Sequence, residues 1–152
     1  MIRVEGQIIR ALQVIKVPET TAEYATVEIN EVQSRMEPVI RDGEVQIRVR
    51  VSVDGRIEDT TSPLEMTPET LDSLERRLAQ TVRNDIEAAL STAQGFNSDI
   101  FGFGQSIYRR MPKEWRQIED QWDELFTRLV VNIEVDANIR RSGLINDSLR
   151  FR

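Results

Sequence analysis

The chain has 152 residues and a net charge of −6, and 39% of its residues are hydrophobic while 30% are charged. This composition is typical of a folded globular protein, and no apolar run approaches the roughly 20 residues needed to cross a bilayer. The absence of cysteine and histidine excludes disulfide bonds, a cysteine nucleophile, a histidine base and an ordinary zinc site, and the acidic charge argues against binding of nucleic acid.

Strand patterns occupy the first part of the chain. A mostly apolar run predicts a strand over residues 12–17, which Pro18 terminates, and β-forming residues predict a second strand over residues 24–33. Asp42 and Gly43 supply a turn before the clearest strand of the sequence. In that strand aliphatic residues alternate with polar ones, at Val45, Ile47, Val49, Val51 and Val53. Such alternation buries one face and leaves the other in water, as in antiparallel sheets.

Three helices are predicted after these strands. Pro68 follows a threonine cap and begins a long helix, in which apolar residues recur at helical spacing to about residue 94. Ser98 is expected to cap a second helix with Asp99 in its first turn, and Pro112 is expected to begin the third. The expected buried stripes are Ile100, Phe103, Ile107 and Met111 in the second helix, and Trp115, Ile118, Trp122 and Leu125 in the third.

A last strand is predicted near the end of the chain, where aliphatic and polar residues alternate between Leu129 and Ile139. The element order is therefore β-β-β-α-α-α-β. Strands followed by a block of helices predict an α+β fold, with an antiparallel, roughly four-stranded sheet and three helices, one of them long, packed on one face. We expect residues 1–152 to form a single domain.

Three separate blocks of residues carry a resemblance to a known family. The first spans residues 98–104 (Ser-Asp-Ile-Phe-Gly-Phe-Gly) and is followed by Pro112 and Trp115. The second combines Trp122, Asp123 and Phe126. The third consists of Ile139, Arg140, Arg141, Ser142, Gly143 and Leu144. In this order the blocks resemble the C-terminal domain of the C-subunit family of bacterial spore germinant receptors, the GerAC-type lipoproteins.

The resemblance implies a role and a place in the cell. Members of this family are lipid-anchored accessory proteins that assemble with an integral-membrane A subunit and a B subunit at the outer face of the spore inner membrane. This chain has no lipid-anchor cysteine, so we expect it to be the C-terminal domain of such a lipoprotein. In the family the signature residues serve packing and have no assigned catalytic role; here they are Asp99, Phe101, Gly102, Phe103, Gly104, Pro112, Trp115, Trp122 and Gly143.

Glycines and tryptophans of the signature admit a ligand-binding interpretation. Gly102 and Gly104 resemble part of a phosphate-binding loop, but Ile107 stands where the third glycine belongs and a helix precedes them in place of a strand. The glycines are therefore expected to permit close packing. Trp115 and Trp122 could line a pocket, but their spacing on one helical stripe favours a place in the core.

Charged residues form two further groups. The acidic group could share a cation or supply an acid–base pair, although a solvated helix face is favoured; it consists of Glu119, Asp120, Asp123 and Glu124. The basic group consists of two doublets, Arg109 with Arg110 and Arg140 with Arg141. These arginines could bind a carboxylate, a lipid headgroup or acidic residues of a partner, or they could form internal salt bridges.

The resemblance implies a non-catalytic interaction domain without cofactor or metal, and the residues themselves argue against an enzyme because no nucleophile has a partner base. The alternative is a domain that senses a small ligand, and a hydrolase using a carboxylate pair is a third possibility. A concave, apolar pocket beside Trp115 or Trp122 would favour the sensor, whereas a flat face with a polar rim would favour the interaction domain.

Overall fold

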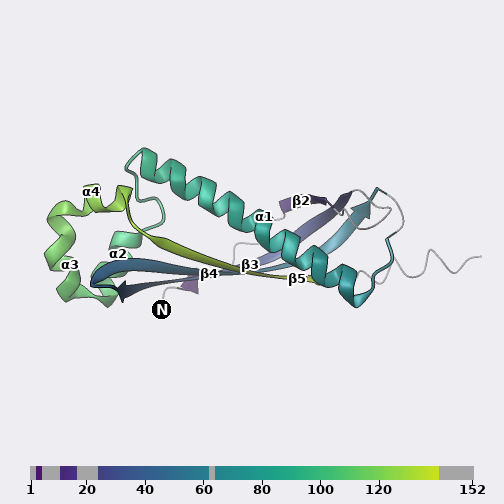
Figure 1. The fold of residues 1–152 in the computed structure, drawn as a ribbon, viewed down its shortest axis with the longest axis horizontal. Helices are drawn as coiled ribbons and strands as arrows, with labels where there is room; N and C mark the ends of the chain where they lie inside the picture. Colours follow the sequence, from purple (N-terminus) through teal and green to yellow (C-terminus); the bar gives the residue numbers. More distant parts are fainter. Residues whose placement is uncertain (1–2, 5–10, 17–23, 62–63, 141–152) are drawn as a thin grey trace, which may run out of the picture. The chain divides into compact units, whose positions relative to one another are not determined.

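The computed structural model describes residues 3–4, 11–16, 24–61 and 64–140 (Figure 1). Its elements are β1 (Arg3–Val4), β2 (Ala11–Lys16), β3 (Tyr24–Arg41), β4 (Glu44–Thr60), α1 (Pro68–Gly95), α2 (Phe103–Arg110), α3 (Pro112–Ile118), the 3-10 helix η1 (Glu119–Gln121), α4 (Trp122–Thr127) and β5 (Val131–Arg140). The α+β class and the order of strands and helices are confirmed. β1 is an additional strand of two residues, and the third predicted helix is divided into α3, η1 and α4.

β3 and β4 form the middle of one sheet. β1 and β2 pair in antiparallel fashion with two different stretches of β3, around Arg35 and around Val27 respectively. β3 is followed by β4 and then by β5 at the edge. Among the described residues, at most four strands therefore lie side by side at any point along the sheet, because β1 and β2 both pair with β3 on the side away from β4.

The sheet is mixed, whereas the sequence predicted an antiparallel one. Asn132 lies within hydrogen-bonding distance of Gln46, and Glu134 pairs with Arg50, so residue numbers rise together along β5 and β4. Figure 1 shows the two strands running in the same direction. Their connection runs through all the helices, and this is the long crossover that parallel neighbours require.

A two-residue turn joins β3 to β4. Asp42 and Gly43 have φ angles of 52° and 80°, the positive values of a type I′ hairpin turn. The predicted turn is thus confirmed. β3 continues to Arg41 rather than ending at residue 33, since pairing with β4 supplies partners for a segment in which Glu37 and Pro38 do not favour a strand.

The second helix begins later than expected. Residues 98–102 form a turn, and α2 starts at Phe103. Gly102, directly before α2, has a φ of 74°, a left-handed conformation that a continuous helix from Ser98 would not allow. In consequence Ile100 is 70% exposed instead of buried, while Phe103 and Ile107 do lie in the core.

The chain divides into two compact units. Unit 1 contains residues 1–4, 34–51 and 83–134, and unit 2 contains the remainder. The core of unit 1 is formed by Ile47, Ala93, Phe103, Ile107 and Phe126, which come from β4, α1, α2 and α4. Half-buried side chains pack around it, including Val45, Val49, Trp115 and Trp122.

Unit 2 has its own buried residues from strands and from the first half of α1. They are Ile15, Ala25, Val27, Ile29, Val53, Ile57, Leu74, Leu78 and Ile139. At Gly55 the backbones of β4 and β3 approach closely, because a Cβ added there would lie 2.9 Å from the carbonyl oxygen of Glu28. The edge of β5 is capped within this unit, where Glu75 of α1 accepts a hydrogen bond from the backbone N–H of Ile139 at 3.0 Å.

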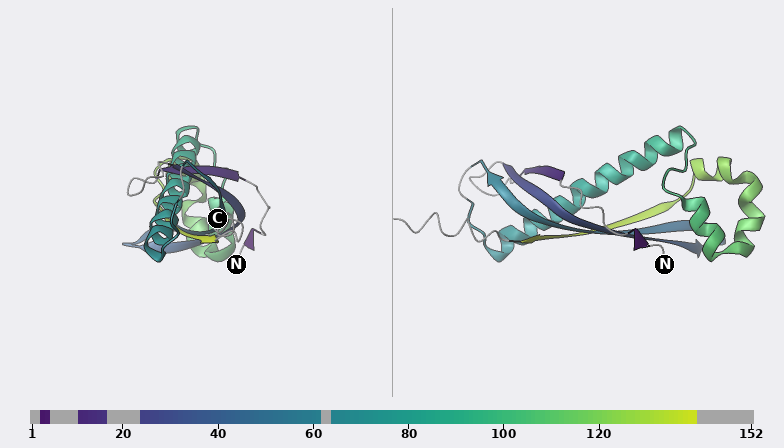
Figure 2. Two further views of the ribbon diagram at one scale, coloured as in Figure 1. Left: turned by 90° about the vertical axis from the view of Figure 1, so that its right-hand side faces the viewer. Right: turned by 180° about the vertical axis from the view of Figure 1, so that it is seen from behind.

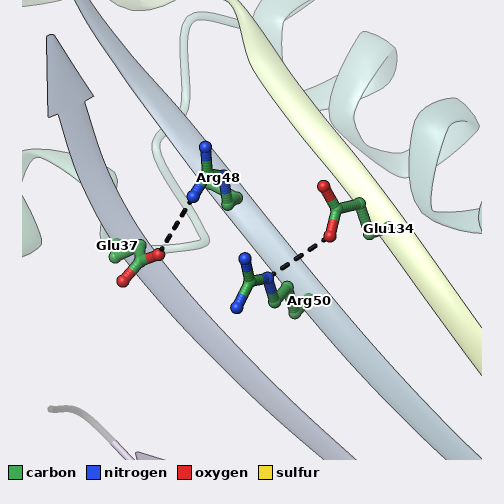
Figure 3. A network of polar contacts seen from close by, with 4 residues as sticks. All are labelled: Glu37, Arg48, Arg50 and Glu134. Atoms are coloured by element: carbon green, nitrogen blue, oxygen red, sulfur yellow. Dashed lines mark hydrogen bonds and ion pairs between the residues drawn. The ribbon is translucent and has the colours of Figure 1, made fainter.

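Ion pairs link neighbouring strands on the polar side of the sheet. In unit 1, Arg48 lies 3.6 Å from Glu37 of β3 and Arg50 lies 3.3 Å from Glu134 of β5 (Figure 3). In unit 2, a hydrogen bond to Glu28 and the nearby charge of Glu58 raise the pKa of Arg56. These pairs are solvent-accessible and contribute little stability each.

Candidate functional site

The signature loop before α2 is held by one carboxylate. Asp99 Oδ1 accepts a hydrogen bond from the backbone N–H of Phe103 at 2.9 Å, and its Oδ2 accepts one from Gly104 at 2.8 Å. The first two N–H groups of α2, which have no partner within the helix, are thereby satisfied. Asp99 therefore acts on the helix from the preceding turn rather than from its first turn, and both of its oxygens are used.

Aromatic rings from α2, α3, α4 and the turn before α2 form a continuous cluster in unit 1. Phe103 stacks on Phe101 at 5.2 Å and meets Phe126 at 6.4 Å, measured between ring centroids. Trp122 lies 6.0 Å from Phe126 and 5.4 Å from Trp115. These separations are those of favourable aromatic pairs. The cluster connects the helices that surround the end of the β3–β4 hairpin (Figure 2).

Gly104 lies directly against both tryptophans. A Cβ added to it would be 2.8 Å from Trp122 Nε1 and 3.1 Å from Trp115 Cη2. Only a residue without a side chain fits there, so the geometry around Gly104 is that of close packing. At Gly102 a side chain would have space, but the positive φ of this residue favours glycine. Neither residue forms part of a phosphate-binding loop after a strand.

A pocket opens in unit 1 beside Trp122. Its volume is about 780 Å³, and it lies between the end of the β3–β4 hairpin, the helices α3 and α4, and the start of β5. Its apolar walls are formed by Ile40, Val45, Ile118, Trp122, Leu125, Leu129 and Val130. Polar residues at the same site are Glu44, Glu114, Gln117 and Arg128. The volume falls within the range of small-ligand sites, and the lining combines apolar walls with a few polar groups.

Sequence reasoning found only one side of this pocket. Ile118, Trp122 and Leu125 were predicted as an apolar stripe and do lie together along the pocket. Ile40 and Val130 were not singled out, although each is 48% exposed despite being a large aliphatic residue. In the sequence, Ile40 comes shortly before the predicted turn at Asp42 and Gly43, and Val130 lies in the predicted last strand, so neither position indicated a pocket.

The structure describes three of the four arginines of the two doublets, and these three belong to different units. Arg109 and Arg110 are exposed at the end of α2 in unit 1, whereas Arg140 is exposed at the end of β5 in unit 2. Arg141 and Gly143 lie outside the described residues. Lys113 and Arg116 of α3 extend the first doublet into a group of four exposed cations, and Tyr108, 59% exposed, precedes them. Within the described ranges none of these four cations makes an ion pair.

The acidic group is spread over two elements. Asp120 lies in η1 and Glu124 in α4, and both are exposed, as are Glu119 and Asp123. Glu124 pairs with Arg128 at 3.8 Å. In the part of the chain that the structure describes, no three acidic side chains converge on a possible metal site. Among these same residues, no helix is long and apolar enough to span a membrane.

The chain is similar to several spore germination proteins. A family model described as "Spore germination B3/ GerAC like, C-terminal" matches residues 3–143. Spore germination protein KC of Bacillus subtilis (strain 168) is 28% identical over 134 residues, which are 87% of this chain and 33% of that protein. Spore germination protein YndF of the same strain is 22% identical over 120 residues, 78% of this chain and 30% of that protein. The chain thus spans about a third of the length of these relatives.

The fold is also found in a solved structure. The crystal structure of the GerBC protein has a TM-score of 0.71 to this chain at 18% sequence identity. The match covers 85% of this chain and 40% of the other. It therefore shows that most of the described chain adopts an already observed fold.

Proposed function

This chain belongs to the family of GerAC-like C-terminal domains of spore germination proteins, and we propose on this basis that it is the non-catalytic interaction domain of a germinant receptor C subunit. Residues 1–152 would be one domain of a longer lipoprotein, anchored at the outer face of the spore inner membrane. Its partners would be the A and B subunits of the receptor. Its contribution to nutrient-triggered germination would be contact with these subunits rather than chemistry.

One observation carries this proposal: the group of exposed cations on α2 and α3. Arg109, Arg110, Lys113 and Arg116 lie within eight residues of one another in a chain of net charge −6. Most other described arginines of unit 1 behave differently, since Arg48, Arg50, Arg83 and Arg128 each pair with a glutamate. Arginine and tyrosine are enriched in protein interfaces, and a positive patch on an acidic protein gives a contact its orientation.

The experiment is charge reversal in the full-length C subunit. Arg109→Glu with Arg110→Glu should abolish co-purification with the A and B subunits and should slow nutrient germination. Arg35→Glu with Arg41→Glu is the matched control, because both residues are exposed in unit 1 and the change in net charge is the same. Retained co-purification by the first variant would remove the support for this surface. Arg140, in unit 2, is proposed to contact a receptor subunit as well, and it can be reversed separately.

We propose that the domain is non-catalytic because its candidate acid–base residues are exposed to solvent. A carboxylate pair acting as acid and base needs environments that drive the two pKa values apart. Asp120 and Glu124 are both exposed to solvent, and one of them already pairs with an arginine. Hydrolytic activity that disappears in Asp120→Asn would contradict this part of the proposal.

The pocket beside Trp122 favours a second candidate function, the sensing of a small ligand. It meets the condition that a sensor requires, a concave and mostly apolar site with a few polar groups next to a signature tryptophan. The two functions are compatible, since the pocket lies on the hairpin side of α3. Lys113 and Arg116 point elsewhere, because Glu114, Gln117 and Ile118 form the pocket side of the same helix.

A further inference from the structure

We infer that the pocket beside Trp122 binds a small ligand with an apolar body and a positively charged amine. The inference deepens the second candidate function and does not depend on the interaction surface of Arg109 and Arg110. It rests on three features of the pocket, namely its size, its apolar walls and the charges that remain without a partner at its edge.

The size of the pocket suits one small molecule. A volume of about 780 Å³ falls within the range of roughly 300–1,000 Å³ that small-ligand sites occupy. A short strand-to-strand turn, two short helices and the start of β5 surround it, so the site is closed on several sides by separate elements. This arrangement holds a compact body better than it holds an extended chain.

The walls select an apolar body. Ile40 and Val130 are each 48% exposed, and such exposure of large aliphatic side chains at one site has a hydrophobic cost that a ligand would relieve. Trp122 adds an indole ring, while Leu125 and Leu129 supply aliphatic surface. An indole face also attracts a cation placed over it.

The charged groups of the pocket select a cation. Glu44 of β4 and Glu114 of α3 both line the site, and neither carboxylate has a hydrogen bond or an ion pair within the described ranges. Arg128, the cation of the lining, lies 3.8 Å from Glu124, which is not a lining residue. The two negative charges of the pocket therefore have no partner among the described residues, whereas its positive charge, on Arg128, is paired with Glu124. An ammonium group on the ligand would be attracted by both glutamates.

The test uses three probes of similar shape and different charge. They are 2-phenylethylamine, 2-phenylethanol and 3-phenylpropanoate, whose polar ends are cationic, neutral and anionic at neutral pH. Binding to the whole chain is measured by calorimetry and by the change in tryptophan fluorescence at low salt. We expect the amine to bind about fivefold more tightly than the alcohol, the upper end of what a solvent-accessible ion pair contributes, and the acid to bind more weakly than either.

Variants separate the charge from the apolar walls. Glu44→Gln with Glu114→Gln should abolish the preference for the amine while leaving the affinity for the alcohol unchanged. Glu119→Gln with Asp120→Asn is the matched control, because it removes the same number of negative charges and both residues are exposed in η1 without lining the pocket. Leu125→Ala should weaken all three probes alike.

Each result decides the inference. A preference for the amine that only the pocket glutamates abolish would support it. Equal affinity for the three probes would overturn the preference for a cation while leaving a ligand pocket in place. Absence of binding at millimolar concentration would overturn both the inference and the sensing function. Co-purification with the receptor subunits tests the interaction domain independently of all three results.

Discussion

Replacing Gly104 by alanine tests how tightly the signature packs. The added Cβ would lie 2.8 Å from Trp122 Nε1, 3.0 Å from Trp122 Cε2 and 3.1 Å from Trp115 Cη2. Comfortable contacts between such atoms are about 3.5–4.0 Å, so both indole rings have to move. Extra atoms in a well-packed core cost about 1–3 kcal/mol. Against this, alanine is favoured over glycine in a helix by at most about 1 kcal/mol.

We therefore expect Gly104→Ala to lower the free energy of unfolding by about 1–2 kcal/mol, which corresponds to about 2–8 °C in melting temperature for a chain of this length. Gly95→Ala is the control. Gly95 ends α1, and a Cβ added there would meet no atom within 4 Å, so this change should be neutral or slightly stabilising. Urea denaturation of the two variants and the parent provides the comparison.

A double variant shows whether the tryptophans are responsible. In the background of Trp115→Ala, one of the close contacts of the new methyl group is gone, and Trp122 gains room to move. Gly104→Ala should then cost less than it does in the parent, with a coupling energy of at least about 0.5 kcal/mol. Equal melting of Gly104→Ala and Gly95→Ala, or strict additivity in the double variant, would refute the reasoning.

Substitutions at three residues probe the same unit further. Asp99→Ala should cost about 1 kcal/mol by urea denaturation, because two N–H groups of α2 lose their acceptor, and Asp99→Asn should cost less. Trp115→Ala should cost about 3 kcal/mol in the same assay, the lower end for a large aromatic residue, since this side chain is only half-buried. Gln94→Glu should destabilise more than Gln94→Ala in thermal melts. The amide of Gln94 donates to the carbonyl oxygens of Phe126 and Leu129 at 3.1 and 3.0 Å, and a carboxylate would repel both.

The regular elements were predictable because their signals are local. α1 begins where Thr67 and Pro68 predicted, and the hydroxyl of Thr67 accepts a hydrogen bond from the N–H of Thr70. In β4 the alternating aliphatic residues are buried at Ile47, Val51 and Val53, as their period of two requires. Neither result depends on which element lies next to which.

Features that depend on distant partners were not predictable in this way. The direction of β5 is decided by its pairing with β4, and alternation along a strand is the same whether its neighbour runs parallel or antiparallel. The late start of α2 depends on the left-handed conformation of Gly102, which the sequence allows but does not require. In β3 the buried residues near Val27 have odd numbers, whereas the buried Pro38 has an even number, so the pattern of alternation shifts within this strand. In β4 the buried residues have odd numbers throughout.

The candidate site was the least predictable part for a similar reason. Its walls come from two stretches that lie far apart in the sequence, one from Ile40 to Val45 and the other from Glu114 to Val130. Helical spacing indicated that Trp122 belongs to an apolar stripe. It could not indicate that part of this stripe faces a pocket rather than the core.

The short turn between β3 and β4 has a consequence for how the pocket could adapt. With Asp42 and Gly43 as the whole connection, the hydrogen-bonded strands β3 and β4 continue to the pocket, and their pairing makes this wall stiff. On the opposite side, neither α3 nor η1 has a fully buried residue, and η1 has the weaker hydrogen bonds of a 3-10 helix. If the pocket opens and closes, the wall formed by α3 and η1 should therefore be the part that moves. In hydrogen exchange, the amides of residues 119–121 should exchange well before those of β4, and a bound ligand should slow the former more than the latter.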